Sequence, residues 1–71
     1  MSSTRSDARR HKDEAAAAQA SGRWRKALEH YLVLERLEPR DGVWAQRAGD
    51  LYRRLDAKDD AVEAWKRAAD G

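Results

Sequence analysis

The 71-residue chain lacks cysteine, phenylalanine, isoleucine and asparagine, and it has only one proline and four glycines. Without cysteine it has neither a disulfide nor a thiolate metal ligand. No apolar run approaches the roughly 20 residues that span a bilayer, and no apolar segment follows the basic start as in a signal peptide. We therefore expect a soluble, cytoplasmic protein of one domain. The excess of alanine and arginine is typical of a high-GC genome and predicts a bacterial host.

A large excess of charge of one sign is also missing. Charged residues make up 39% of the chain, yet the formal net charge is only +2, which argues against nucleic-acid binding by the chain as a whole. A basic segment near the start keeps nucleic-acid binding as the alternative function; it contains Arg5, Arg9, Arg10 and Lys12. Against this alternative, Asp13 and Glu14 follow at once, and no aromatic residue is interleaved for base stacking.

What the chain does contain is helical periodicity. Residues with β-branched side chains are sparse and nothing alternates as a strand would, so we predict an all-α fold of four helices. The first helix runs from Asp7 to about Ser21, with Ser6 as its N-cap. Gly22 ends it, because glycine accepts the left-handed backbone conformation. Pro39 ends the second helix, since proline cannot continue one.

The third and fourth helices follow two further turns. Asp41 is the predicted cap of the third helix, and Asp59 and Asp60 lie in the first turn of the fourth, where negative charge suits the helix dipole. Each helix carries an apolar stripe at three- and four-residue steps. In chain order the stripes are Ala8, His11, Ala15, Ala18; Trp24, Ala27, Leu28, Tyr31, Leu34, Leu37; Trp44, Ala45, Ala48, Leu51, Tyr52, Leu55; and Ala61, Val62, Trp65, Ala68. We expect the three tryptophans to pack between helices, with Trp24, at a turn, the best candidate for stacking on a ligand.

Sliding the sequence against itself at an offset of 34 superimposes two similar units. The matched pairs are Ala15 with Gly49, Ala18 with Tyr52, Ala27 with Ala61, Leu28 with Val62, Glu29 with Glu63, Tyr31 with Trp65 and Leu34 with Ala68. A helix–turn–helix with a period of 34 resembles the tetratricopeptide repeat. The second unit carries its small-residue pair Ala48-Gly49 and then Tyr52, Ala61 and Trp65; the first supplies Ala27, Tyr31 and the closing Pro39. The first helix departs from the pattern, with His11, Glu14, Ala15 and Ala18 where larger apolar residues and glycine are usual.

The resemblance implies two antiparallel helical hairpins stacked as a short α-solenoid. Residues 1–7 are then a flexible N-terminal segment, 8–41 the first repeat and 42–71 the second. Tetratricopeptide repeats are adaptor modules whose first helices line a concave groove that holds a peptide or a partner helix. We therefore expect a protein–protein interaction adaptor with a protein or peptide partner, without catalytic activity.

The groove implied by this resemblance is basic. Its predicted residues, which we call the basic groove, are Arg9, Lys12, Gln19, Gln46, Asp50, Arg53 and Arg54. Four basic groups against one acid favour an acidic segment or a C-terminal carboxylate as ligand, because arginine pairs bidentately with carboxylates. Family members that clamp a terminal carboxylate use a lysine and asparagines. Lys12 matches the lysine, but Ala16 stands where an asparagine is expected. A solvated helix face without a ligand is the other interpretation.

Two repeats are fewer than the three or so that usually give independent stability, and no polar capping helix follows them. We therefore predict that the last helix has an open face, carrying Val62, Trp65 and Ala69, that packs on something. The candidates are a second copy of the chain, a partner protein or further repeats.

Motifs for catalysis or metal binding are absent. There is no glycine-rich phosphate loop and no serine placed beside a histidine and an acid. His11 and His30 lie on different helices, far apart in the sequence and without an evident acidic ligand set, and we expect His30 on a solvated face. The turn "DAKDD" lacks the length and the glycine of a calcium loop, and the mixed charges of the last helix weaken a membrane role. We predict no metal, cofactor or catalytic site.

Overall fold

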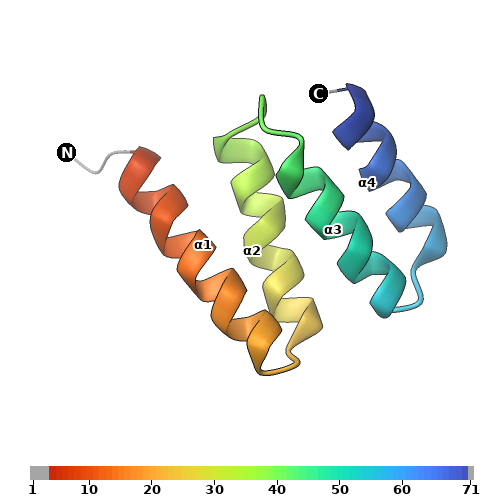
Figure 1. Cartoon of the computed structure of the whole chain (residues 1–71), viewed down its shortest axis with the longest axis horizontal. Coiled ribbons are helices and arrows are strands. Elements are labelled where there is room, and N and C mark those ends of the chain that lie inside the picture. Colours follow the sequence, from red (N-terminus) through yellow and green to blue (C-terminus); the bar gives the residue numbers. More distant parts are fainter. Residues whose placement is uncertain (1–3, 71) are drawn as a thin grey trace.

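Four α-helices joined by three short turns make up the computed structural model, which describes residues 4–70. They are α1 (Thr4–Ala20), α2 (Trp24–Leu37), α3 (Val43–Arg54) and α4 (Lys58–Asp70). The helices lie in a row in the order of the sequence, each antiparallel to the one before it (Figure 1). No strand occurs in residues 4–70, so the predicted all-α fold of four helices in two hairpins is confirmed.

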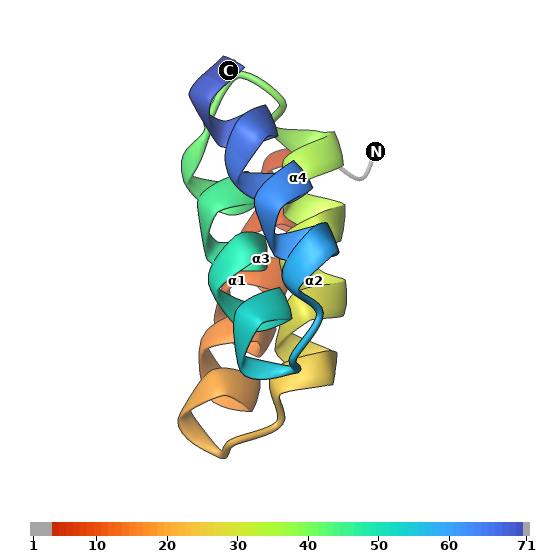
Figure 2. The same cartoon turned by 90° about the vertical axis from the view of Figure 1, so that its right-hand side faces the viewer.

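The backbones of neighbouring helices pack together: within the described part of the chain, α1 packs on α2, α2 on α3, and α3 on α4. Helices two apart in the sequence meet only through long side chains. Viewed along the row, α1 overlaps with α3 and α2 with α4, so the helices form two layers (Figure 2). The molecule measures 39 × 30 × 12 Å. Such a row has two open ends, the outer face of α1 and the outer face of α4.

Two charge-assisted hydrogen bonds connect α2 and α4, the helices of one layer. Arg67 of α4 donates from Nε to Oε2 of Glu35 on α2 over 2.7 Å, and from Nη2 to Oε1 over 3.1 Å. These hydrogen bonds, and the negative charge of Glu35, raise the pKa of Arg67. The contact is half exposed, so it aligns the two hairpins more than it stabilises them.

Alanine makes up most of the interior. Twelve hydrophobic residues are buried in the part of the chain that the structure describes, and eight of them are alanines. Leu34 and Leu51 are the largest side chains that are fully buried. Because a methyl group is small, the helices approach closely but remove little apolar area from water.

The predicted stripes of the first three helices are confirmed, while that of α4 is rotated. Ala61 and Ala64 are the buried residues of α4. Val62, predicted to lie in the stripe, is 45% exposed, and Trp65 is half-buried. The reason is that the backbone of α4 lies close to α3 only, so α4 buries a narrow face.

The start of α1 differs from the prediction. The helix begins at Thr4, so Ser6 lies inside it and the prediction of Ser6 as N-cap is wrong. Asp7 lies in the first turn, where its carboxylate favours a helix that extends further towards the N-terminus. Residues 1–3 of the predicted flexible segment lie outside the described residues, as does Gly71. At the start of α3, Asp41 accepts a hydrogen bond from the backbone N–H of Val43 over 3.2 Å, although Gly42 occupies the cap position itself.

The two hairpin turns are built alike and are separated by one period of the sequence repeat. Each contains the two backbone hydrogen bonds of a Schellman motif. In the first turn the N–H groups of Gly22 and Arg23 donate to the carbonyls of Gln19 and Ala18; in the second those of Asp56 and Ala57 donate to Arg53 and Tyr52. This motif places one residue in the left-handed region, and Gly22 (φ 76°) and Asp56 (φ 62°) occupy it. The period found in the sequence is therefore also a period of backbone conformation.

Packing inside the second hairpin depends on a glycine. Gly49 of α3 is buried, and a β-carbon at this position would overlap the indole ring of Trp65 on α4. A methyl group there must displace the ring, since the contact leaves no free space. The predicted roles of Gly49 as a small residue and of Trp65 as the bulky one beside it are confirmed.

Left-handed backbone is costly for residues other than glycine, and the two turns test this directly. We expect Asp56→Gly to raise the free energy of unfolding by about 0.5 kcal/mol and Gly22→Ala to lower it by about 1 kcal/mol. A β-carbon at Gly22 meets no atom within 4 Å, so that loss is conformational. Urea unfolding of the three proteins measures both changes; opposite signs would contradict the shared turn motif.

A β-carbon at position 49 overlaps the Trp65 ring, so a larger residue there is expected to lower the free energy of unfolding. We expect Gly49→Ala to destabilise the protein by about 1–2 kcal/mol, although alanine is the better helix former. In a Trp65→Leu background the same change is expected to cost less than about 0.5 kcal/mol, because the ring is gone. Equal costs of Gly49→Ala in both backgrounds, measured by urea unfolding, would refute the contact.

Candidate functional site

The outer face of α4, meaning Val62, Trp65 and Ala69, carries exposed apolar side chains. Trp65 is half-buried, with its indole ring against Gly49 of α3, and Val62 is the one large hydrophobic side chain that is exposed in residues 6–70. Two open concavities adjoin it. One is lined by Gln46, Asp50, Trp65, Ala68 and Ala69, and the other by Arg53, Lys58, Ala61, Val62 and Trp65. The exposed Val62 and the two concavities thus lie together on one side of α4.

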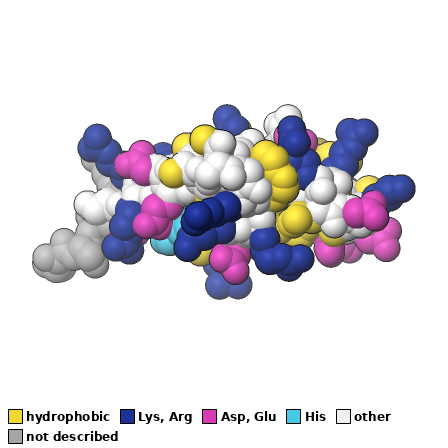
Figure 3. Space-filling model, turned by 90° about the horizontal axis from the view of Figure 1, so that it is seen from below, with side chains coloured by type: hydrophobic (Ala, Val, Ile, Leu, Met, Phe, Trp, Pro, Cys, Tyr) yellow, Lys and Arg dark blue, Asp and Glu magenta, His cyan; other side chains and the backbone are white. Residues whose placement is uncertain are grey.

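The basic groove is only partly assembled. Four of its predicted residues line one concavity between α1 and α3: Gln19, Asp50, Arg53 and Arg54. Gln46 lies instead beside the outer face of α4. Arg9 and Lys12 lie on the N-terminal half of α1, away from this concavity. Figure 3 shows Lys and Arg side chains interspersed with Asp and Glu on the face that it views, with hydrophobic patches between them.

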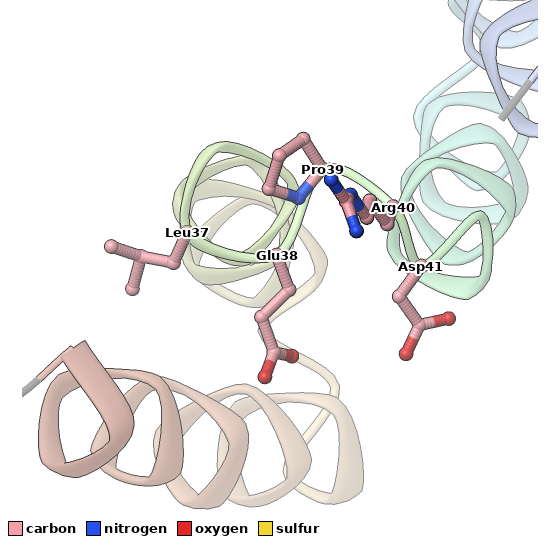
Figure 4. A pocket seen from close by; sticks show the side chains of 5 residues that line it. All are labelled: Leu37, Glu38, Pro39, Arg40 and Asp41. Atoms are coloured by element: carbon pink, nitrogen blue, oxygen red, sulfur yellow. The ribbon is translucent and has the colours of Figure 1, made fainter.

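Lys12 is held by contacts within the molecule. Its Nζ lies 3.4 Å from Oε1 of Glu38 and 5.4 Å from the ring centre of Trp44. The indole N–H of Trp44 donates to the same Glu38 oxygen over 2.8 Å, and Trp44 stacks on Tyr31. Figure 4 shows Glu38, at the end of α2, pointing towards α1 beside the concavity lined by Leu37, Glu38, Pro39, Arg40 and Asp41. The cluster joins α1, α2 and α3 and neutralises the charge of Lys12.

Arg54 and Gln19 are also engaged. The guanidinium of Arg54 lies 4.7 Å from the ring centre of Trp24, so it covers the aromatic face that the sequence suggested for ligand stacking. Trp24 and Trp44 pack against the core, in line with the prediction that the tryptophans fill space between helices. The hydroxyl of Tyr31 donates to Oε1 of Gln19 over 2.8 Å. Lys12 and Arg54 therefore have partners within the molecule, although both remain exposed, as do Asp50 and Arg53.

Sequence reasoning missed a cluster that joins α1 to α2. The Nδ1 atoms of His11 and His30 lie 2.9 Å apart, and Nε2 of His30 lies 3.4 Å from Oε2 of Glu14. The side chain of His30 is only 15% exposed, so the prediction of a solvated face for it is wrong. The hairpin itself was the available signal, because residues at similar distances on either side of the turn at Gly22 face each other across antiparallel helices.

In residues 4–70, no helix combines the length and apolar character that crossing a membrane requires. Comparison of the chain with models of known protein families finds no match, and neither the curated proteins nor the solved structures yield one.

Proposed function

We propose that the chain is a homodimeric protein–protein interaction adaptor built of two tetratricopeptide-like repeats. The observation that carries the proposal is the outer face of α4, where Val62 is 45% exposed beside a half-buried Trp65 and two concavities. A buried stripe and an open one on the same short helix are typical of a repeat that lacks its next neighbour.

Equivalent positions of the two units agree in backbone conformation and in burial, which supports the repeat. The same turn motif recurs after one period, at Gly22 and Asp56. Small residues recur at equivalent buried positions, with Ala15 matching Gly49 and Ala27 matching Ala61. Helices in two layers, with close backbone packing between sequence neighbours, are what a stack of hairpins requires.

A second copy of the chain is the proposed occupant of the outer face of α4. Asp59 and Lys66 are exposed and lie three and four residues on either side of Val62, hence on the same side of the helix. Two α4 helices packed antiparallel about Val62 place Asp59 of each copy opposite Lys66 of the other. A twofold axis makes this contact twice, as a closed dimer needs.

The part of the basic groove between α1 and α3 is the proposed ligand site on each copy. Its concavity between α1 and α3 offers Arg53 and Arg54 beside Gln19 and Asp50. Arginine favours carboxylates through paired hydrogen bonds, so an acidic peptide or a C-terminal carboxylate is the proposed ligand class.

A homodimer has twice the chain mass in solution, and a variant that disrupts the interface halves this mass. At low micromolar concentration we expect twice the chain mass of 8.1 kDa for the natural sequence, and the single chain mass for Val62→Glu, because a buried carboxylate at the centre of the interface is unpaired. Multi-angle light scattering measures both. Ala17→Glu, an exposed alanine on α1, is the matched control and is expected to stay dimeric. A monomeric mass for the natural chain would refute the dimer.

Charge exchange tests how the two copies are oriented. We expect Asp59→Lys to weaken the dimer about tenfold, since it opposes two lysines, and the double exchange Asp59→Lys with Lys66→Asp to restore it. Sedimentation equilibrium gives the dissociation constants. A double variant no tighter than the single one would exclude the antiparallel pairing and leave the dimer itself to the mass measurement.

Binding at the basic groove is tested separately. We expect a labelled acidic peptide with a free C-terminal carboxylate to lose at least about tenfold in affinity on Arg53→Glu with Arg54→Glu, because two attractive contacts become repulsive. Arg25→Glu with Lys26→Glu, exposed at the start of α2, is the control of equal charge. Fluorescence anisotropy measures the affinities; equal losses in both double variants, or none in either, would contradict a specific groove.

A further inference from the structure

Three potential metal ligands meet where α1 crosses α2. They are His11 and Glu14 on α1 and His30 on α2, and one ligand atom from each lies within 4.8 Å of the other two. The imidazole Nδ1 atoms face each other at 2.9 Å, and the rings are 5.1 Å apart and inclined by 44°. Two nitrogens bound to one zinc ion at about 2.0–2.1 Å are separated by about 3 Å, so the two rings already have the spacing of neighbouring ligands.

The cluster is held in place yet open to solvent. His30 is 15% exposed and His11 is half-buried, so packing restricts both rings, whereas the Glu14 side chain is 52% exposed. Figure 3 shows a histidine side chain at the surface among charged groups. An ion can therefore reach the site and keep water molecules in its remaining positions.

The second hairpin shows that the fold does not need these residues. One period further along the chain, His11 corresponds to Ala45, Glu14 to Ala48 and His30 to Ala64. All three alanines are buried and satisfy the same helix pairing without a polar group. The structure thus contains one hairpin with alanines at these positions and one with three metal-binding side chains.

From this juxtaposition we propose that the first hairpin binds a divalent first-row transition ion, with Zn²⁺ as the reference ion. One ring nitrogen from each histidine and a carboxylate oxygen of Glu14 are the ligands, and water completes the shell. Two imidazoles and one carboxylate form a ligand set that suits zinc, copper and nickel and is poor for magnesium or calcium.

The bound ion joins α1 to α2. The buried part of α1 consists of Ala8, Ala15 and Ala18, so this helix removes little apolar area from water on its own. Bonds from one ion to both helices add a contact that the alanines cannot supply, and binding to the folded state alone stabilises that state. The role is separate from dimerisation, because the cluster lies on the hairpin furthest from the outer face of α4.

Calorimetric titration of the untagged full chain with zinc chloride tests the site. We expect one ion per chain with a dissociation constant in the low micromolar range, and a loss of at least about tenfold in affinity for His11→Ala, His30→Ala or Glu14→Gln. The alanine variants are expected to remain helical by circular dichroism, since the second hairpin has alanine at both positions. Asp13→Asn, an exposed acid next to Glu14, is the matched control and is expected to bind like the natural chain.

A second readout separates a site between helices from binding elsewhere. Zinc is expected to raise the thermal unfolding midpoint of the natural chain and of Asp13→Asn, and to leave that of His11→Ala with His30→Ala unchanged. Equal zinc affinity in this double variant and in the natural chain would overturn the proposal, as would a natural chain that binds no zinc at micromolar concentration. Should the alanine variants unfold, Glu14→Gln still decides, because its side chain is exposed and carries no packing role.

Discussion

Alanine at the helix contacts is the constraint from which the rest of the structure follows. Eight of the twelve buried hydrophobic residues in residues 6–70 are alanines. The helices of each pair therefore approach closely but bury little apolar area. At about 25 cal/mol per Å², a methyl group contributes far less than a leucine side chain. Such a row of hairpins leaves two open ends. At one end lies the outer face of α4, and at the other a helix held by Ala8, Ala15 and Ala18 together with a polar cluster.

The same constraint explains where larger residues are found. Gly49 leaves room for Trp65, and the absence of a side chain at this glycine is what allows the largest ring to lie between α3 and α4. Tyr31 takes the equivalent place in the first hairpin and donates its hydroxyl hydrogen to Gln19. The aromatic rings therefore restore part of the apolar area that the alanines leave out, while the hydrogen bonds of Tyr31 and Trp44 keep their polar atoms satisfied.

Much of this fold is predictable from the sequence, because helix periodicity, Gly22 and Pro39 are local signals. The period of 34 also follows from the sequence, since the small and bulky residues repeat with it. The start of α1 is harder to predict because Ser6 suits both a cap and a first turn, and only the extent of the helix decides between them. Asp56 in the left-handed conformation has no clear sequence signal either, since glycine is the usual residue there.

Side-chain partners between helices are harder to predict, and the candidate sites show why. The positive charge assigned to Lys12 is offset by Glu38, which is distant in the chain and lies beside it only because the hairpin folds back. His11 and His30 meet for the same reason. Residue spacing within one helix contains no record of such pairs. Which side chains meet depends on the axial position and rotation of each helix. Alanine contacts specify these only loosely in the sequence.

We propose that the two alanine-lined hairpins gain part of their stability from a second copy at the outer face of α4. The thermal unfolding midpoint as a function of protein concentration tests it most directly, because a dimer that unfolds to separate chains becomes more stable as concentration rises. We expect a midpoint that increases steadily from the low micromolar to the high micromolar range of protein concentration. A midpoint that is independent of concentration over this range would contradict it.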